Sequence, residues 1–274
     1  MKKKLYQMCC DIIDEAYPEA KDSMIGGLYK GFRLSLQNRN LKTKHGDYFA
    51  KTRTIRIFNL ERGSEAAIKT AIHELAHHVT LVRTGHLDHS SFFYDEYEKL
   101  LSAAIRMGIL SFFDLELISD GSSDYNKIMK RIRALNPAEN IVDYKQDVYI
   151  FKVRNSFDFK EKLKERNYSY DTLQKLWWKE IDKEHRYEEE LYLRKIIKSQ
   201  KDLEITEGNQ FTLDVYKKII VHSGFEIRDF LRGSGYQYDG RNRTWAKRVL
   251  ASELEEEMKK IPKKRSSVIE VVGC

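Results

Sequence analysis

The chain has 274 residues, of which 41% are hydrophobic and 33% are charged. That length is enough for two domains, and no apolar run approaches the roughly 20 residues that cross a membrane as a helix. Three cysteines, two of them adjacent, make a poor disulfide framework, and the N-terminus lacks the apolar segment of a secretory signal. We therefore expect a cytoplasmic protein without a membrane partner. The net charge of +7 permits contact with nucleic acid without demonstrating it.

Hydrophobic spacing divides the first hundred residues into helices and strands. Apolar residues at intervals of three and four predict amphipathic helices, and alternating apolar residues predict strands. Ser64 is a good N-cap candidate, and Gly85 stands where a helix would end. The elements expected in order are a helix over 4–16, a turn at Gly26-Gly27, strands over 29–36 and 52–60, and helices over 64–84 and 91–107.

The helix expected over 64–84 carries the motif His73-Glu74-Leu75-Ala76-His77. Because His73 and His77 are four residues apart, their imidazoles lie on one face of a helix, one turn apart. Two imidazoles placed in this way can hold one Zn²⁺ ion. Glu74 stands beside the first ligand and can act as a base toward a water molecule. The motif therefore predicts a zinc site with His73 and His77 as metal ligands and Glu74 as the catalytic residue.

A catalytic zinc site needs a third protein ligand and keeps its fourth position open. Downstream, His89 is followed four residues later by Phe93. His-Glu-Leu-Ala-His with this later His and Phe resembles the SprT-like metallopeptidases, which are minimal zincins. The runs at 44–48 and 54–58 look like the strand pair that precedes the zinc helix in that family, and the resemblance covers about residues 20–105. It implies a minimal-zincin fold, zinc endopeptidase activity and His89 as the third metal ligand.

The sequence alone does not decide which residue is the third metal ligand. The family usually has Gly after the third His, where this chain has Ser90, and this leaves His86 as a competing ligand. A glutamate ligand, as in gluzincins, has Glu96 and Glu98 as candidates, although nothing after the zinc helix looks like the helix that carries it there. The metzincin pattern is excluded because Arg83 stands where it needs a third His.

The second half of the chain contains an internal repeat. Shifting the sequence by 68 residues, without a gap, aligns two copies. Each copy predicts a strand, a helix and a hairpin, followed by a Glu-rich helix. The pattern resembles a small module of mobile-element proteins, from which no function follows. Identical pairs are Val153/Val221, Phe157/Phe225, Leu163/Leu231, Tyr168/Tyr236, Tyr170/Tyr238, Asp171/Asp239, Trp177/Trp245 and Lys179/Lys247.

The most linker-like composition lies at 119–124, and a domain boundary is expected there. The expected fold class is α+β. It comprises an N-terminal minimal-zincin domain (helix, antiparallel strands, zinc helix, helix) followed by two repeated β-α-β-β modules. The expected divisions are a zinc metallopeptidase domain over 1–120, a linker and short helix over 121–140, and modules over 141–205 and 206–274.

These features predict a zinc metalloendopeptidase that hydrolyses peptide bonds of a protein substrate, which the C-terminal modules recruit. The alternative is a nucleic-acid-associated mobile-element protein whose zinc site is mainly structural. Nucleic acid is an open second partner, because Tyr238 with Arg241, Arg243 and Lys247 could form a stacking platform for a single strand. The simpler interpretation is that the shared aromatic residues form the core of each module.

Overall fold

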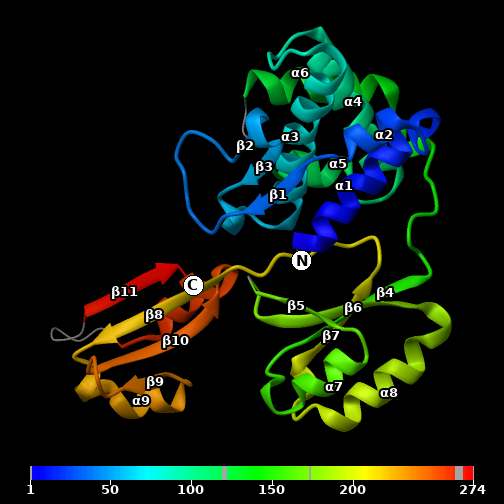
Figure 1. The fold of residues 1–274 in the computed structure, drawn as a ribbon. Coiled ribbons are helices and arrows are strands. Elements are labelled where there is room, and N and C mark those ends of the chain that lie inside the picture. The colour runs from blue at the N-terminus through cyan, green and yellow to red at the C-terminus, as the bar shows by residue number, and fades with distance from the viewer. Residues whose placement is uncertain (1, 119–121, 173, 263–267, 274) are drawn as a thin grey trace.

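The computed structural model describes residues 2–118, 122–172, 174–262 and 268–273. It has an α+β architecture (Figure 1), in which an N-terminal mixed region of helices and a small sheet is followed by two four-stranded antiparallel sheets with short helices. The expected α+β class is confirmed at this level. Within the described residues, no helix is both long enough and apolar enough to cross a membrane.

The N-terminal region combines a three-stranded sheet with a group of helices. Its elements are α1 (Lys2–Ala16), α2 (Met24–Tyr29), β1 (Arg33–Leu36), β2 (Gly46–Phe49), β3 (Thr54–Ile57), α3 (Ser64–Thr84), α4 (Ser91–Arg106), α5 (Phe112–Leu117) and α6 (Ser123–Leu135). The strand order is β1-β3-β2, with β1 parallel and β2 antiparallel to β3. The strand pair expected before the helix of the motif forms as the antiparallel pair of β2 and β3, and β2 is an edge strand. The expectation of antiparallel strands is wrong for β1, because the chain reverses twice between β1 and β3 and the two strands run parallel.

Two sequence features, the glycine pair Gly26-Gly27 and Ser64, have a different role in the structure from the one expected. Gly26 and Gly27 lie inside α2 rather than in a turn. Gly26 has to be glycine because the backbone at Ala20 approaches it closely: a Cβ on Gly26 would lie 2.0 Å from the Ala20 carbonyl oxygen. Helix α3 begins at Ser64 itself, so this residue is not its N-cap. The Ser64 hydroxyl instead accepts a hydrogen bond from the Leu213 N–H at 2.9 Å, which ties the start of α3 to a distant segment.

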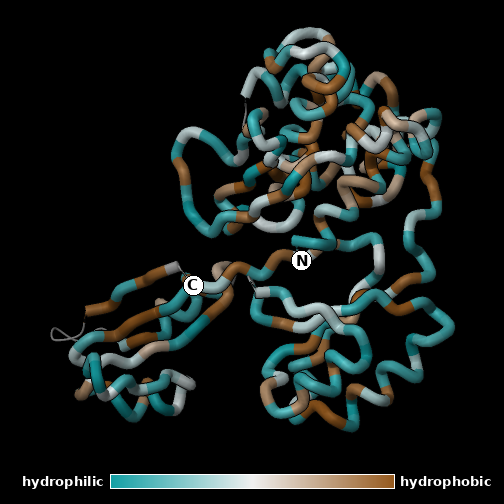
Figure 2. The backbone as a smooth tube through the Cα atoms, in the orientation of Figure 1, coloured by the Kyte–Doolittle hydropathy of each residue, from teal (hydrophilic) through white to brown (hydrophobic). Residues whose placement is uncertain are grey.

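One continuous hydrophobic core holds α3 against α1, α4 and the sheet. Side chains with no solvent exposure enter it from each element: Leu5 and Ile12 from α1, Ile55 and Ile57 from β3, Ile72, Leu75 and Val79 from α3, and Phe93, Leu100 and Leu101 from α4. Complete burial of one such side chain contributes about 1.5–3 kcal/mol. Figure 2 shows hydrophobic residues gathered in the interior of this region. The core therefore fixes α3 relative to α4.

This core extends past the expected first domain. Helix α6 packs beside α4 and buries Ile132 in the core, and Trp178 from the first module joins it. The buried ammonium group of Lys4 pairs with Glu180 of the same module at 2.6 Å. The expected boundary falls on residues 119–121, which lie outside the described residues, and it stays a prediction. A fragment ending there would lose the contribution of α6.

The two modules share one architecture. The first contains β4 (Val148–Val153), α7 (Lys160–Glu165), β5 (Ser169–Asp171), β6 (Leu176–Asp182), α8 (Arg186–Ile196) and β7 (Leu203–Glu207), and the second contains β8 (Tyr216–His222), α9 (Arg228–Gly233), β9 (Gln237–Asp239), β10 (Thr244–Leu250), α10 (Leu254–Lys260) and β11 (Val268–Gly273). Their sheets have the orders β5-β6-β4-β7 and β9-β10-β8-β11. Val153 lies opposite Trp177 in one sheet, and Val221 lies opposite Trp245 in the other. Strand register is thus repeated along with sequence.

Each module has one strand more than expected. After the Glu-rich helix, β7 pairs with β4 and β11 pairs with β8, which completes a β-α-β-β-α-β unit. These strands were not expected because the repeat in the sequence is clear only as far as the hairpin and its trailing helix. The expected module boundary between residues 205 and 206 falls inside β7. The first sheet therefore ends at Glu207, and the chain reaches the second through residues 208–215.

A buried histidine joins α3 to the sheet and to α2. His78 has no solvent exposure. The Tyr48 hydroxyl lies 2.8 Å from its Nδ1, and its Nε2 lies 3.1 Å from the Leu28 carbonyl oxygen. A carbonyl oxygen can only accept, so Nε2 carries the proton and Nδ1 accepts from the hydroxyl. Burial lowers the pKa of His78 to about 4, because the charged imidazolium would be desolvated.

The neutral state of His78 predicts an acid-sensitive contribution to stability. The unfolded chain protonates this residue near pH 6.5 and the folded chain near pH 4, so the contribution is lost as pH falls between those values. The test is to measure the free energy of unfolding of metal-free wild type and of His78→Met with denaturant at pH 7.5 and pH 5.0. The stability advantage of the wild type should shrink by about 1.4 kcal/mol per pH unit below pH 6.5. An advantage independent of pH would show that His78 is not held neutral.

Candidate metal centre

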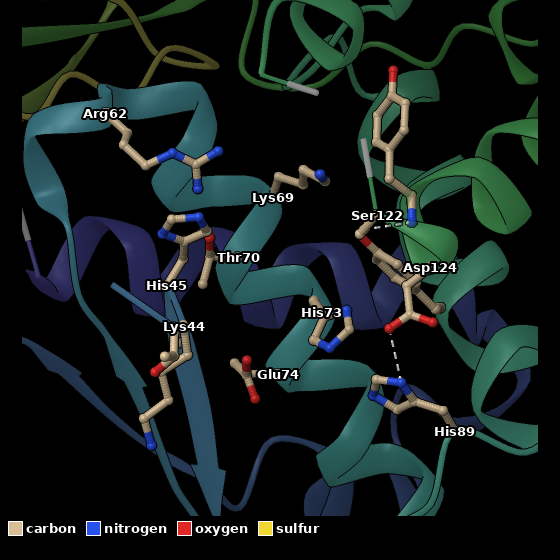
Figure 3. A pocket seen from close by; sticks show the side chains of 14 residues that line it. Lys44, His45, Arg62, Lys69, Thr70, His73, Glu74, His89, Ser122 and Asp124 are labelled. Carbon is tan, nitrogen blue, oxygen red and sulfur yellow. Dashed lines mark hydrogen bonds and ion pairs between the residues drawn. The ribbon is translucent and has the colours of Figure 1, made fainter. Parts of the chain in front are cut away.

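The two histidines of the motif meet a later histidine in the N-terminal region. His73 and His77 belong to α3, and His89 belongs to the loop before α4. One ring nitrogen from each lies within 4.8 Å of the others, and His77 Nε2 lies 3.0 Å from His89 Nε2. In Figure 3, His73 and His89 extend toward the same space from opposite sides. The structure therefore brings together all three histidines that the sequence suggested as metal ligands.

The competing ligands lie elsewhere. His86 is exposed and stands outside the histidine group. The carboxylate of Glu96 pairs with Arg83 at 2.5 Å, and the Glu98 carboxylate pairs with Arg131. Both glutamates are thus held by arginines and take no part in the histidine group.

Phe93 explains why His89 approaches the helix. This residue sits in the first turn of α4 and has no solvent exposure. Its ring stacks on His89 with centroids 4.4 Å apart, and it lies 4.5 Å from the ring of His77. The aromatic side chain four residues after His89 therefore supports two of the three imidazoles and limits their rotation.

Asp124 orients His89 and was not anticipated from the sequence. Its Oδ2 lies 2.9 Å from His89 Nδ1, as the dashed line in Figure 3 shows. The Tyr94 hydroxyl also donates a hydrogen bond to the same carboxylate. A carboxylate that accepts from Nδ1–H leaves the lone pair of the imidazole on Nε2, the atom that faces His77. The available signal was Ser122-Ser123-Asp124, a helix-start pattern within the segment taken as a linker.

Burial keeps the histidines of α3 uncharged. It lowers the pKa of His73 to about 3 and that of His77 to about 4, and the neighbouring imidazoles act in the same direction. Both side chains are therefore neutral at pH 7. A neutral imidazole is the form that binds a metal ion, so no proton must be removed first.

Glu74 faces a cavity of about 340 Å³ between β2, α3 and the start of α6. The wall of this cavity also includes His73, His89 and Asp124 (Figure 3). The side chain of Glu74 is almost completely buried. Burial, reinforced by the negative charge of Asp47, raises its pKa to about 8. Without a metal ion this carboxyl group is therefore mostly protonated at pH 7. A cation bound beside it would lower the pKa and favour the carboxylate, the form that can accept a proton.

Gly46 brings the edge strand against this carboxyl group. A Cβ on Gly46 would lie 2.9 Å from Glu74 Oε1 and 2.5 Å from Thr70 Cγ2. Any side chain there would displace the strand or the glutamate, so the approach of β2 to α3 depends on glycine.

The donor set fits a zinc ion. Three imidazoles converge, a carboxylate orients one of them, and within the described residues the group contains no fourth ligand. Three protein ligands with one open position are usual at catalytic zinc, and three histidines are one such set. Comparisons with protein-family models, curated proteins and solved structures find no match for this chain. The resemblance to SprT-like metallopeptidases therefore stays a prediction from the sequence.

We expect one zinc ion per chain, bound through His73, His77 and His89. Zinc measured by mass spectrometry after dialysis should fall close to zero in His77→Ala and in His89→Ala, because two imidazoles hold the ion too weakly. The control variant His86→Ala should retain it. Full retention of zinc in His89→Ala would reject His89 as a ligand.

Asp124→Asn should weaken zinc binding without abolishing it. The amide cannot accept the Nδ1–H bond with the strength of a carboxylate, and loss of such a partner costs about 10- to 100-fold in metal affinity. Competition with a chromophoric zinc chelator measures the change. The neighbouring variant Asp88→Asn removes the same charge beside His89 and should leave the affinity unchanged. Equal effects of both variants would show that only the net charge matters.

Proposed function

We propose that this protein is a zinc-dependent endopeptidase that cleaves a protein substrate. The observation that carries the proposal is the position of Glu74 in the same cavity wall as two of the three converging histidines. A binding site for a structural metal needs no buried carboxyl group beside it. The resemblance of the zinc helix and of the His89–Phe93 spacing to SprT-like enzymes supports the same reaction class.

The residues have separable roles in this proposal. His73, His77 and His89 would hold Zn²⁺, which when bound would activate a water molecule and polarise the scissile carbonyl group. Glu74 accepts a proton from the attacking water and later donates it to the leaving amine. Asp124 holds the orientation of His89.

Strand β2 offers a place for an extended substrate. It is an edge strand, its partner on one side is β3, and its first residue, Gly46, lines the cavity. An edge strand presents main-chain groups that can pair with a peptide. A substrate paired with β2 would run along the cavity past Glu74. Specificity would then come from side-chain contacts outside the zinc site and from recruitment by the modules.

The alternative function is that of a nucleic-acid-associated protein with a structural zinc site. The observation in its favour is a cationic and aromatic surface on the modules, which is described below. A structural zinc site normally has four protein ligands. His86, the residue available for that role, is exposed and lies outside the group. This favours the peptidase.

Glu74→Gln should keep the zinc ion and lose hydrolysis. Loss of a general base slows such reactions by about 10²- to 10⁴-fold, which we would measure as cleavage of denatured casein by the zinc-loaded chain. Glu65→Gln, an exposed position on the same helix, is the matched control and should cleave at the wild-type rate. Equal cleavage by Glu74→Gln and wild type would reject the role of Glu74. Absence of any chelator-sensitive cleavage by the wild type would favour the structural alternative.

A further inference from the structure

A second cavity, of about 500 Å³, lies on the second module. It forms where the 3₁₀ turn Gly224–Ile227 and α9 meet the hairpin of β9 and β10. Phe225 and Tyr238 are 74% and 55% exposed, whereas Trp245 is buried beneath them. The side chains that matter in its wall are Phe225, Arg228, Arg232, Tyr238, Arg243 and Trp245.

The pocket carries positive charge without opposing carboxylates in its wall. The Arg228 guanidinium lies over the Phe225 ring, 4.4 Å from its centroid, and is 3.9 Å from the exposed carboxylate of Asp229. Within the part of the chain that the structure describes, Arg232 and Arg243 have no ion-pair partner. The positive charge of these two side chains is therefore available to a ligand.

The first module keeps the same kind of side chain, aromatic or cationic, at each of these six positions. Moving back by 68 residues gives, in order, Phe157, Lys160, Lys164, Tyr170, Lys175 and Trp177. The aromatic residues are identical, and each arginine is replaced by lysine. The ring of Tyr170 lies 5.2 Å from Trp177 at 51°, and Tyr238 lies at the same distance and angle from Trp245. Lys175 and Arg243 also share a left-handed backbone, with φ of 54° and 53°.

Core packing explains the tryptophans but not the other positions. Phe157 is 80% exposed, and its counterpart Phe225 is nearly as exposed, so neither contributes much to a core. Neighbouring positions around the same helices have changed freely between the copies, as in Lys162/Phe230, Glu165/Gly233 and Arg166/Ser234. Two copies of one module thus retain exposed aromatic rings and cations at the pocket while altering the residues around it. Binding is the physical reason that accounts for this pattern.

We propose that this pocket, and the equivalent surface of the first module, bind single-stranded nucleic acid. The exposed rings of Phe225 and Tyr238 stack on unpaired bases, and Arg228, Arg232 and Arg243 contact the phosphates. A duplex keeps its bases stacked and cannot present them to such a recess. A single strand carries a phosphate and an unpaired planar base in every nucleotide, so it matches the three cations and the two exposed rings together, whereas an acidic peptide matches only the cations. The α7 and α9 sides of the two modules both lie away from the N-terminal region in Figure 1, so a strand can reach them without crossing the zinc site.

The structure changes the set of cations expected from the sequence. Arg243 lines the pocket, but Arg241 does not. The Lys247 ammonium pairs with Glu257 at 2.6 Å and lies over the buried ring of Tyr236. Tyr168 and Tyr236 belong to the cores of their modules, whereas Tyr170 and Tyr238 are exposed.

Fluorescence anisotropy of the full chain with labelled 20-nucleotide oligo(dT), oligo(rU) and a 20-base-pair duplex tests the proposal. We expect both single strands to bind at least tenfold more tightly than the duplex at 50 mM salt. Phe225→Ala and Tyr238→Ala should each weaken binding by roughly tenfold, which is within the range for loss of one base stack. Arg232→Gln and Arg243→Gln should each lower the slope of log affinity against log salt by about 0.7.

The control Arg241→Gln removes one charge from the same hairpin turn and should change affinity little. Substitutions at exposed rings should leave the circular dichroism spectrum and unfolding midpoint unchanged. Binding should be the same in zinc-depleted protein and in Glu74→Gln, so this test is independent of the proposed peptidase. Equal losses in Arg241→Gln and Arg243→Gln, or no binding of either single strand at 50 mM salt, would overturn the proposal. If dTMP bound as tightly as the oligonucleotides, the ligand would be a free nucleotide and the proposal of a single strand would be overturned.

Discussion

The packing of α3 against α4 is the constraint on which the candidate site depends. Helix α3 carries two histidines at a fixed spacing, but the third comes from the loop that leads into α4. The position of that loop is set by Phe93, which has no solvent exposure and contacts the rings of both His77 and His89. Leu75 and Val79 on one helix and Leu100 and Leu101 on the other enter the same core. A loss of this packing would separate the imidazoles even if every ligand were kept.

Glu74, the proposed general base, is held by a different contact. Glu74 acquires its raised pKa from burial, and part of that burial comes from β2, which approaches only because Gly46 has no side chain. Asp47 on the same strand adds negative charge while pairing with Arg56 at 2.5 Å. The sheet therefore shapes both the access to the cavity and the proton affinity of the glutamate. The arrangement of the three histidines is thus set by α3 and by the loop before α4, whereas the environment of Glu74 is set by the edge strand β2.

Local patterns predicted the parts of the site that lie close together in sequence. The spacing of His73 and His77, the apolar stripe of α3 and the phenylalanine after His89 are all readable from short segments. Asp124 was not, because it follows His89 by 35 residues and reaches it only through the packing of α6 beside α4. Gly46 carried no signal either, since the need for glycine arises from the Glu74 and Thr70 side chains of another element. The additional strands β7 and β11 were not predicted for a related reason. Their pairing partners, β4 and β8, lie far away in the sequence, so a local pattern does not indicate the pairing.

The internal repeat separates core requirements from surface requirements within one chain. Tyr168 donates a hydrogen bond to the buried Glu189, and Tyr236 with Glu257 occupies the equivalent place in the second module. Folding alone explains why both copies keep these pairs. Folding does not explain why both copies keep exposed rings and cations around Trp177 and Trp245. Those residues mark the surface on which the modules would act. The first module also packs on the N-terminal region through Trp178, which belongs to the same hydrophobic core as Ile72 and Leu75 of α3.

X-ray absorption at the zinc K-edge tests the central claim most directly, because it reports the ligands of the ion itself. For the zinc-loaded full chain, we predict a coordination shell of three imidazoles and one oxygen that does not come from the protein, and the same shell in His86→Ala. A shell of four protein ligands, or one in which a carboxylate replaces an imidazole, would contradict a catalytic site built from His73, His77 and His89.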